Sequence, residues 1–373
     1  MASPGDNPST QWTDGREHWV DKDGVRLFLW EKPRRAGTAH AGTILFVHGS
    51  SMASQPTFDL HVPGRPDSSV MSWFAERGFD TWTMDNEGYG RSDKHRPINC
   101  GIENGAEDLA AGSAYILQQS GARGLLVYGI SSGALKAALF AQQHPERVAR
   151  LVLDAFVWTG EGSPTLHERA KRLPEFLRTN RRPIDRAFVR SIFTRDHPGC
   201  ADDRTVEAFA DAILALDDSM PTGTYVDMCS RLPMVDPKKV LAPTLILRGE
   251  YDGIAALDDL IRFFVALPEM DKQFNVMRGI SHASFQQKNH LMVYHLLHGD
   301  KAEALDSALQ FAPDGSPMAA YVLAAAYRLN GQGARADETL ADLAVKTPMA
   351  IRDREELTQS LRIPSKLASL IFG

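Results

Sequence analysis

The sequence predicts an α/β protein in which helices flank a mostly parallel sheet. Two short, nearly continuous apolar runs, residues 43–47 and 125–130, are typical of strands that are buried on both faces of a parallel sheet. The second run leads through a glycine-flanked turn into residues 134–144, whose apolar spacing is that of a helix. Because strands and helices alternate in this way, we expect one sheet with helices on its faces.

Composition argues against several classes of protein. The 373 residues can bury a large core, and the net charge of −6 argues against a nucleic-acid partner, since such proteins carry basic patches. Three cysteines, Cys100, Cys200 and Cys229, stand far apart without CxxC spacing, so we expect reduced thiols in a cytoplasmic protein and no disulfide or zinc site. Residues 1–15 resemble neither a signal peptide nor a membrane anchor and are expected to form a flexible tail, and no later run is long enough to span a membrane.

The first elements are expected to form an antiparallel edge. Residues 17–20 and 25–33 alternate as strands around Asp23-Gly24, a dipeptide that suits a hairpin turn. The buried strand 43–47 follows and runs directly into His48-Gly49-Ser50-Ser51. A loop of small residues at the carboxyl end of such a strand can present a backbone N–H to a ligand. We assign this role to the amide of Ser50, with Ser51 as the near alternative.

Two helices and a strand are expected before the central run. Asp67 is predicted to cap a helix over residues 68–78, and residues 79–84 are predicted to form a strand. The turn-rich loop 85–92 is assigned a structural role, in which its side chains satisfy local backbone groups. Residues 105–119 are predicted to form a helix that ends at Gly121.

Ser131 lies at the apex of the predicted strand-turn-helix. Such a turn forces its apex residue into a sparsely populated backbone conformation, so small residues are needed on both sides, and Gly129 and Gly133 provide them. The hydroxyl of Ser131 would be exposed as a nucleophile. The amide of Ser132 opens the following helix, where an unpaired N–H and the helix dipole favour a developing negative charge.

At this point the chain resembles the α/β-hydrolase fold superfamily. The matching segments are VHGSS, MDNEGYGRSD, GISSG, PTLILRGEYD and GISHASF, and they cover about the first four-fifths of the sequence. The resemblance implies that a nucleophile, an acid and a histidine follow one another in this order. It also implies a helical cap between the sixth and seventh strands. The loop after His48-Gly49 lacks the HGGG form of many esterases and lipases, so no subfamily or substrate is indicated.

A base and an acid follow the nucleophile in the expected order. His282 comes after a strand predicted at residues 274–280, and Asp252 comes just past a strand that Pro243 opens. A base must reach Ser131, and an acid must hold the imidazole in one tautomer and stabilise its charge. Asp154, which follows another buried strand, is the alternative acid. We favour Asp252, because its loop matches the position that the resemblance implies.

Residues 158–239 interrupt the alternation of strands and helices. They are mostly helical and polar, and the resemblance implies that they form the cap, which would exclude water and shape the pocket. Their first half is basic, and two interpretations remain open: a solvated helix face, or a site for an anionic group of the substrate. The basic residues are Arg169, Lys171, Arg172, Arg178, Arg181, Arg182, Arg186 and Arg190.

The remaining features suggest no further chemistry. His290, His295 and His298 lie on a helix predicted over residues 283–297, without the HExxH pattern or the carboxylates of a metal site, so no metal or other cofactor is expected. Residues 300–373 read as a helical extension with one tetratricopeptide-like hairpin around residues 331–333, too short for a solenoid. We expect it to pack on the catalytic domain or on a second subunit of a homodimer.

The predicted organisation is therefore a tail (1–15), an α/β-hydrolase core (16–157 and 240–299), a helical cap (158–239) and a C-terminal helical extension (300–373). The predicted function is hydrolysis of a small-molecule carboxylic ester or lactone by Ser131, His282 and Asp252, through an acyl-enzyme and with no nucleic-acid or membrane partner. Acyl transfer, cleavage of a diketone carbon–carbon bond and cleavage of a peptide remain open on the same frame. A receptor that binds a ligand without turnover is the alternative outside enzymes.

Overall fold

The computed structural model describes residues 15–300, 324, 327–328 and 332–346. The chain divides into two compact units, Met1–Lys288 and Asn289–Gly373. The predicted tail, residues 1–15, lies outside the described residues except for Gly15. Among the described residues, no helix is long and apolar enough to cross a membrane.

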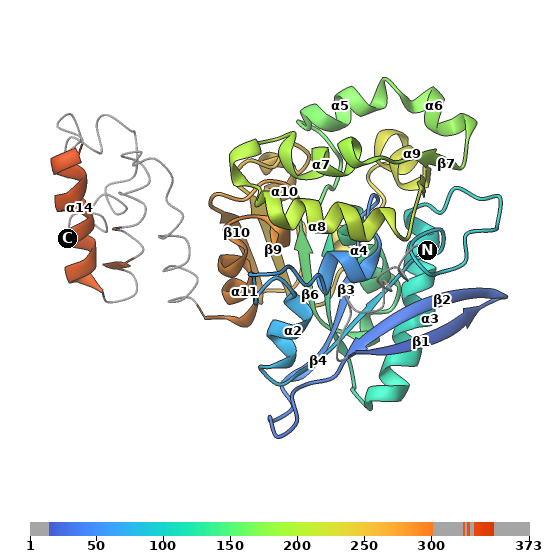
Figure 1. The fold of residues 1–373 in the computed structure, drawn as a ribbon, viewed down its shortest axis with the longest axis horizontal. Coiled ribbons are helices and arrows are strands. Elements are labelled where there is room, and N and C mark those ends of the chain that lie inside the picture. Colours follow the sequence, from blue (N-terminus) through green and yellow to red (C-terminus); the bar gives the residue numbers. More distant parts are fainter. Residues whose placement is uncertain (1–14, 301–323, 325–326, 329–331, 347–373) are drawn as a thin grey trace, which may run out of the picture. The chain divides into compact units, whose positions relative to one another are not determined.

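The first unit is built on an eight-stranded sheet (Figure 1). Its order is β1-β2-β4-β3-β5-β6-β9-β10; the β1–β2 and β2–β4 pairs are antiparallel, and every other pair is parallel. The predicted α/β fold, a mostly parallel sheet flanked by helices, is thus confirmed. The strands are β1 Arg16–Lys22, β2 Val25–Lys32, β3 Gly42–Val47, β4 Phe79–Met84, β5 Leu125–Ile130, β6 Val148–Asp154, β9 Thr244–Gly249 and β10 Lys272–Met277.

Helices cover both faces of the sheet. The side chains of strand β3 pack against apolar neighbours on both of these faces. Leu45 and Val47 point into the main core, which also contains apolar residues of two long helices. Phe46, between them, points the other way and packs against the rings of Phe58 and Phe285. Because side chains alternate along a strand, residues 44–47 of β3 face apolar neighbours on both sides, which explains this apolar run. The helices that flank the sheet are α1 Ser54–Phe58, α2 Val70–Ala75, α3 Ile102–Ser120, α4 Ser132–Gln143 and α10 Leu257–Ala266.

The antiparallel edge has the predicted hairpin. Asp23 and Gly24 both have positive φ angles, 51° and 84°, which a tight turn between antiparallel strands requires. Strand β5 spans residues 125–130, as predicted, and α3 spans residues 102–120, where a helix over 105–119 was predicted. Gly121 ends α3 in the left-handed conformation with φ 67°.

Helix α2 begins later than predicted. Its N-cap is Ser69, whose side chain accepts a hydrogen bond from the amide of Ser72, so the assignment of the cap to Asp67 is wrong. Both residue types cap helices well, and their order in the sequence does not decide between them. The tertiary contacts decide, because the Ser69 hydroxyl also donates to buried Asp59.

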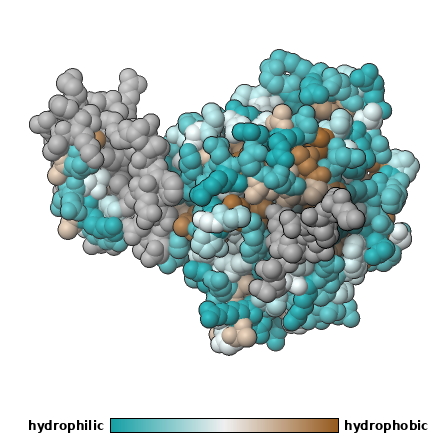
Figure 2. Space-filling model, in the orientation of Figure 1, coloured by the Kyte–Doolittle hydropathy of each residue, from teal (hydrophilic) through white to brown (hydrophobic). Residues whose placement is uncertain are grey.

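Residues 158–239, which we call the cap segment, join β6 to β9 and lie at the top of Figure 1. They form short helices and one pair of three-residue antiparallel strands. The surface of these helices is mostly hydrophilic on the face that Figure 2 shows. The elements are α5 Pro164–Ala170, α6 Leu173–Arg178, β7 Arg181–Pro183, α7 Arg186–Thr194, α8 Asp203–Leu214, β8 Ser219–Pro221 and α9 Gly223–Ser230.

The helix expected at residues 283–297 is shorter than predicted. Residues Ser284–Gln286 form one turn of 3-10 helix, and Gln287 is extended, so α11 begins at His290 and ends at His298. The Gln286 side chain donates a hydrogen bond to the carbonyl of Thr57, which holds this segment against the core. In the second unit, α11 and α14 Gly333–Lys346 are described. The hairpin predicted around residues 331–333 and the dimerisation role of residues 300–373 fall mostly outside the described residues.

Candidate active site

The turn at Ser131 has the strained geometry that its sequence predicts. Ser131 has φ 57° and ψ −125°, a sparsely populated conformation for a residue with a side chain. A Cβ on Gly129 would lie 2.5 Å from the Gly133 carbonyl oxygen, and a Cβ on Gly133 would lie 2.3 Å from the Val47 carbonyl oxygen. Both distances are shorter than any real contact, so the turn can close only with glycine at these two positions.

Ser131, His282 and Asp252 are brought together by three separate loops at the carboxyl ends of β5, β10 and β9. The Nε2 atom of His282 lies 2.8 Å from the Oγ atom of Ser131. Its Nδ1 atom lies 3.0 Å from each carboxylate oxygen of Asp252. In this arrangement the imidazole can accept the proton of the serine hydroxyl while the carboxylate holds its other nitrogen. The contacts are those of a catalytic triad, and the catalytic roles stay a prediction.

Asp252 is buried and yet held as a carboxylate. Its Oδ1 atom accepts hydrogen bonds from the amides of Ile254 and Ala255, at 2.8 and 3.0 Å. Burial alone would raise its pKa, but the charge and hydrogen bond of His282, together with the two amides, lower the pKa to about 2. The side chain is therefore fixed in position and charged at neutral pH.

Asp154, the alternative acid, has different partners. Its Oδ2 atom accepts a hydrogen bond from the Tyr128 hydroxyl at 2.5 Å, and no contact joins it to His282 among the hydrogen bonds and ion pairs of the described residues. Burial raises its pKa to about 7. It lies near the triad without touching the imidazole.

The loop after β3 approaches the turn closely. A Cβ on Gly49 would lie 3.4 Å from the Cβ of Ser131, so the backbone of this loop passes beside the nucleophile. Ser50 and Ser51 line the same cavity as Ser131. Ser132 is the first residue of α4, where the backbone N–H has no partner within the helix. Ser50 thus lines the cavity of Ser131, and Ser132 follows Ser131 at the start of α4; that their amides form an oxyanion hole stays a prediction.

His48 orders this loop through contacts of both its ring nitrogens. Its ring is fully buried, with Nδ1 2.8 Å from the Gly49 carbonyl oxygen and Nε2 3.0 Å from the amide nitrogen of Asn86. Burial, and then the charge of Lys136, lower its pKa well below the ordinary value, so the ring is neutral. A neutral ring that donates from Nδ1 and accepts at Nε2 satisfies both contacts.

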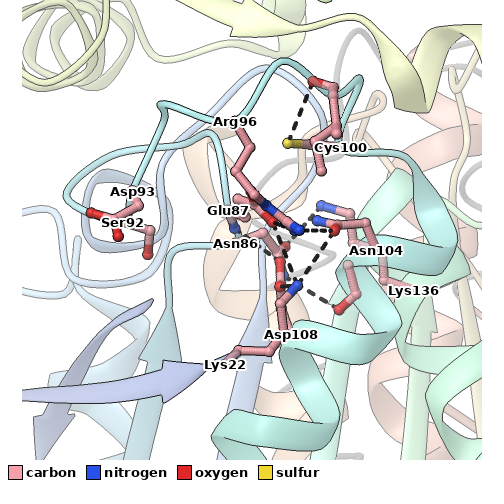
Figure 3. A network of polar contacts seen from close by, with 12 residues as sticks. Lys22, Asn86, Glu87, Ser92, Asp93, Arg96, Cys100, Asn104, Asp108 and Lys136 are labelled. Atoms are coloured by element: carbon pink, nitrogen blue, oxygen red, sulfur yellow. Dashed lines mark hydrogen bonds and ion pairs between the residues drawn. The ribbon is translucent and has the colours of Figure 1, made fainter. Parts of the chain in front are cut away.

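A network of polar side chains joins the loop of residues 85–92 to helices α3 and α4 (Figure 3). Lys136, from the helix that Ser131 opens, donates to the side-chain oxygen of Asn86 at 2.8 Å. Asp108 accepts from the amide of Glu87 and from Lys22. Through the contact of Asn86 with His48, the network ties the helix that follows Ser131 to the loop of residues 48–51.

The cap segment completes the cavity above Ser131. Arg169, Ile192, Arg195 and Tyr225 from the cap segment line it together with the loop and His282. The cavity has a volume of about 20 Å³, little more than the space that one water molecule needs. Among the described residues that line it, none carries a carboxylate.

The sequence interpretation missed several residues of this site. Tyr225 was not identified, because a single tyrosine in a polar helix has no distinguishing pattern. Lys136 carried a signal that could have been used: it is a charged residue in an otherwise apolar helix, five residues after Ser131.

The three histidines of α11 belong to the second unit. The described residues contain no cluster of histidine, cysteine or acidic side chains that could hold a metal.

Comparisons with known proteins concern the family and the fold of the chain. The model of a family described as serine aminopeptidase S33 matches residues 38–289. A proline iminopeptidase of Neisseria meningitidis serogroup A is 28% identical over 189 residues, 47% of this chain and 55% of the relative. A proline iminopeptidase of Neisseria gonorrhoeae is 24% identical over 282 residues, 66% of this chain and 84% of the relative. The chain thus spans about half the length of the first of these relatives.

Solved structures share the fold. A thermophilic esterase from Thermogutta terrifontis superimposes with a TM-score of 0.54 at 19% identity, over 78% of this chain and 99% of the esterase. At this level of identity the similarity concerns the fold alone.

Proposed function

The chain belongs to the serine aminopeptidase S33 family of the α/β-hydrolase superfamily, and from this premise we propose that it hydrolyses a carboxylic ester or lactone with Ser131 as nucleophile. The observation that carries the proposal is the 2.8 Å contact between Ser131 Oγ and His282 Nε2, with Asp252 on the other ring nitrogen. This chain of contacts supports a proton transfer that is concerted with attack on a carbonyl carbon.

The proposed reaction has two halves. The Ser131 oxygen attacks the carbonyl carbon as His282 Nε2 takes the hydroxyl proton, and the amides of Ser50 and Ser132 bind the oxyanion of the tetrahedral intermediate. The intermediate collapses when His282 returns the proton to the departing alcohol oxygen, which leaves an acyl-serine. A water molecule then gives a proton to His282 and attacks the acyl carbon, and Ser131 leaves with that proton.

A serine aminopeptidase is the second candidate, because the family description and the proline iminopeptidase relatives point to it. The charge of the cavity favours an ester instead. An aminopeptidase substrate carries a free amino terminus next to the scissile bond, and at neutral pH that group is largely a cation. Arg169 and Arg195 line the cavity, and no carboxylate is among its described lining residues to bind an ammonium group.

We propose that the cap segment moves during turnover. The cavity holds little more than one water molecule in the present conformation, so a substrate needs the cap helices to shift before it can reach Ser131. Closure afterwards would exclude bulk water from the acyl-enzyme.

The proposal is tested by labelling the protein with a fluorophosphonate probe and by a panel of p-nitrophenyl esters, lactones, a diketone and proline p-nitroanilide. We expect stoichiometric labelling that Ser131→Ala abolishes, and turnover of esters or lactones above that of the anilide. If the protein cleaved proline p-nitroanilide faster than any ester of the panel, an aminopeptidase would replace the ester hydrolase as the proposed function. Absence of labelling and of all turnover would favour a ligand-binding protein.

A further inference from the structure

Two arginines of the cap segment gather on one tyrosine beside the cavity. The guanidinium carbon of Arg169 lies 4.0 Å from the ring centre of Tyr225, and that of Arg182 lies 4.4 Å from the same centre. Tyr225 is only 7% exposed, and both arginines are half-buried. Two like charges therefore each lie within 4.4 Å of the centre of one buried ring, where solvent screens them poorly.

No carboxylate of the described residues pairs with either charge. Among the described residues, no carboxylate oxygen lies within 4.0 Å of the side-chain nitrogens of Arg169 or Arg182. The nearby acids have other partners: Glu168 pairs with Lys171, Glu175 with Arg172, and Asp196 with Arg195. In addition, the Nε atom of Arg182 is buried without a hydrogen-bond partner.

Other basic residues of the same segment behave differently. Arg172, Arg186 and Arg190 are exposed and each has an acidic partner within 3.0 Å. They fit the interpretation of a solvated helix face, which the sequence left open. Arg169 and Arg182 do not fit it, because they are half-buried, unpaired and directed to the tyrosine.

The cluster reaches the cavity of Ser131 through Ser51 and Tyr225. Arg182 Nη2 donates to Ser51 Oγ at 2.9 Å, and the Tyr225 hydroxyl lies 3.2 Å from the same oxygen. Arg169, Ser51 and Tyr225 all line the cavity of Ser131. Burial alone would raise the pKa of Tyr225, but the charges of Arg169 and Arg182 outweigh it and lower the pKa to about 8, which shows a strongly positive local field.

A larger space adjoins this cluster. Tyr225 and Arg182 also line a groove of about 700 Å³ in the cap segment, together with Phe176 and Phe188. The groove offers room for a substrate chain that the 20 Å³ cavity cannot hold.

We propose that the substrate carries a carboxylate, which Arg169 and Arg182 bind beside Tyr225 while Ser131 attacks an ester carbonyl of the same molecule. A planar guanidinium can bind a carboxylate through two parallel hydrogen bonds, and an anion beside Tyr225 would offset the positive charge of both arginines. Monoesters of short dicarboxylic acids, or esters with a carboxylate in the alcohol portion, have this chemistry. The substrate class rests on the proposed ester hydrolysis, whereas the anion site itself does not.

The anion site is tested first by binding, without turnover. Calorimetry with Ser131→Ala protein compares monomethyl glutarate, an anion, with dimethyl glutarate, its neutral counterpart. We expect the anion to bind at least about tenfold more tightly, and the difference to disappear when Arg169→Gln or Arg182→Gln is added. Equal affinity for both esters would overturn the proposal.

Turnover is tested next with two matched pairs of substrates. The mono-p-nitrophenyl ester of glutarate is compared with p-nitrophenyl pentanoate, and 4-acetoxybenzoate with phenyl acetate, so that the charge stands on the acyl side or on the leaving group. We expect kcat/KM to favour the anion in at least one pair, by roughly 10- to 100-fold, mainly through KM. Arg169→Gln and Arg182→Gln should remove this preference, and Arg169→Lys should restore part of it.

Arg190→Gln is the matched control, because Arg190 is an exposed, paired arginine on α7. It should retain the full preference. A preference that survives both Arg169→Gln and Arg182→Gln, or that is absent from wild-type protein that the fluorophosphonate labels, would overturn the proposal. Selective binding of monomethyl glutarate by a protein that cleaves no ester would instead refute the ester hydrolase and leave the anion site standing.

Discussion

The Nζ atom of Lys136 donates a hydrogen bond to the Oδ1 atom of Asn86 at 2.8 Å. The amide of Asn86 in turn donates to Nε2 of His48, so the two contacts link the helix that follows Ser131 to the loop of residues 48–51. Lys136 is fully buried, and burial lowers its pKa to about 8 against the opposing charge of Asp108. A buried amine is costly to retain, so its removal reports what the contact contributes.

Lys136→Met should lower both stability and turnover. Methionine has a similar length, but it leaves the Asn86 oxygen without this donor and removes the positive charge near Asp108, which should cost about 1–3 kcal/mol of unfolding free energy. If the contact positions the oxyanion loop, kcat should fall by roughly tenfold with little change in KM. Urea unfolding and steady-state kinetics measure the two effects.

Lys171→Met is the control for this change. Lys171 is exposed, and among the described residues its ion-pair partner is Glu168, three residues earlier, so stability should change by less than about 0.5 kcal/mol. If Lys136→Met lowered stability but left kcat and KM as in wild type, Lys136 would support the fold and not the loop.

Ser131→Ala should lower turnover by several orders of magnitude, because only substrate binding and the oxyanion hole would still contribute to the rate. Ligand affinity should be retained, which calorimetry can measure. Ser132→Ala serves as the matched change one residue later: its backbone amide remains, so turnover should stay within about tenfold of wild type. The opposite ranking would show that the turn is misassigned.

Strong local patterns made much of the fold predictable from the sequence. The apolar runs of β3 and β5, the Asp23-Gly24 turn and the Gly121 helix end each depend on backbone geometry that few residue types permit. The turn at Ser131 is of the same kind, because the close approach of Val47 and Gly133 excludes any side chain at the flanking positions.

Features that depend on tertiary packing were not predictable in this way. Ser69 caps α2 because it also bonds with buried Asp59, and α11 begins late because Gln286 is held by Thr57. The sequence showed an excess of arginine in the cap segment, but only the fold separates Arg169 and Arg182, which pack on Tyr225, from Arg186 and Arg190, which are paired at the surface.

The buried carboxyl of Asp154 should make stability depend on pH. Burial raises its pKa from 3.8 to about 7, so the folded protein holds a proton there that the unfolded chain releases above about pH 4. The stabilisation is complete below pH 4 and is lost as the pH rises through 7. Asp154→Asn removes this dependence, so the Tm of the variant should rise relative to that of wild type between pH 4.5 and 8.

A second aspartate provides the control for that measurement. Asp202 caps α8, and although burial would raise its pKa, hydrogen bonds from Thr205 lower it, so it titrates below this pH range. Asp202→Asn should therefore show a Tm difference from wild type that is constant from pH 5 to 8. A constant difference for Asp154→Asn as well would mean that Asp154 is ionised in the folded protein at all of these pH values.

The acid of the proposed triad is the assignment that mutation can test most directly. Asp252 contacts the Nδ1 atom of His282 with both oxygens at 3.0 Å, whereas Asp154 bonds with Tyr128. Asp252→Asn retains an oxygen for the amides of Ile254 and Ala255, so the loop should keep its shape. The amide nitrogen would face Nδ1, however, which favours the tautomer with the proton on Nε2, where it cannot accept the proton of Ser131.

Turnover of Asp252→Asn should therefore fall by about 10³- to 10⁴-fold with the fold intact by circular dichroism. Asp154→Asn should cost less than about tenfold at pH 6, where Asp154 is mostly uncharged and an amide is a close substitute. Both variants are assayed at pH 6 and pH 8 with the best ester of the panel, because a role of the Asp154 charge would appear only at the higher pH. If Asp154→Asn proved the more damaging change at both pH values, the acid of the triad would be Asp154, and the contact between Asp252 and His282 would be structural.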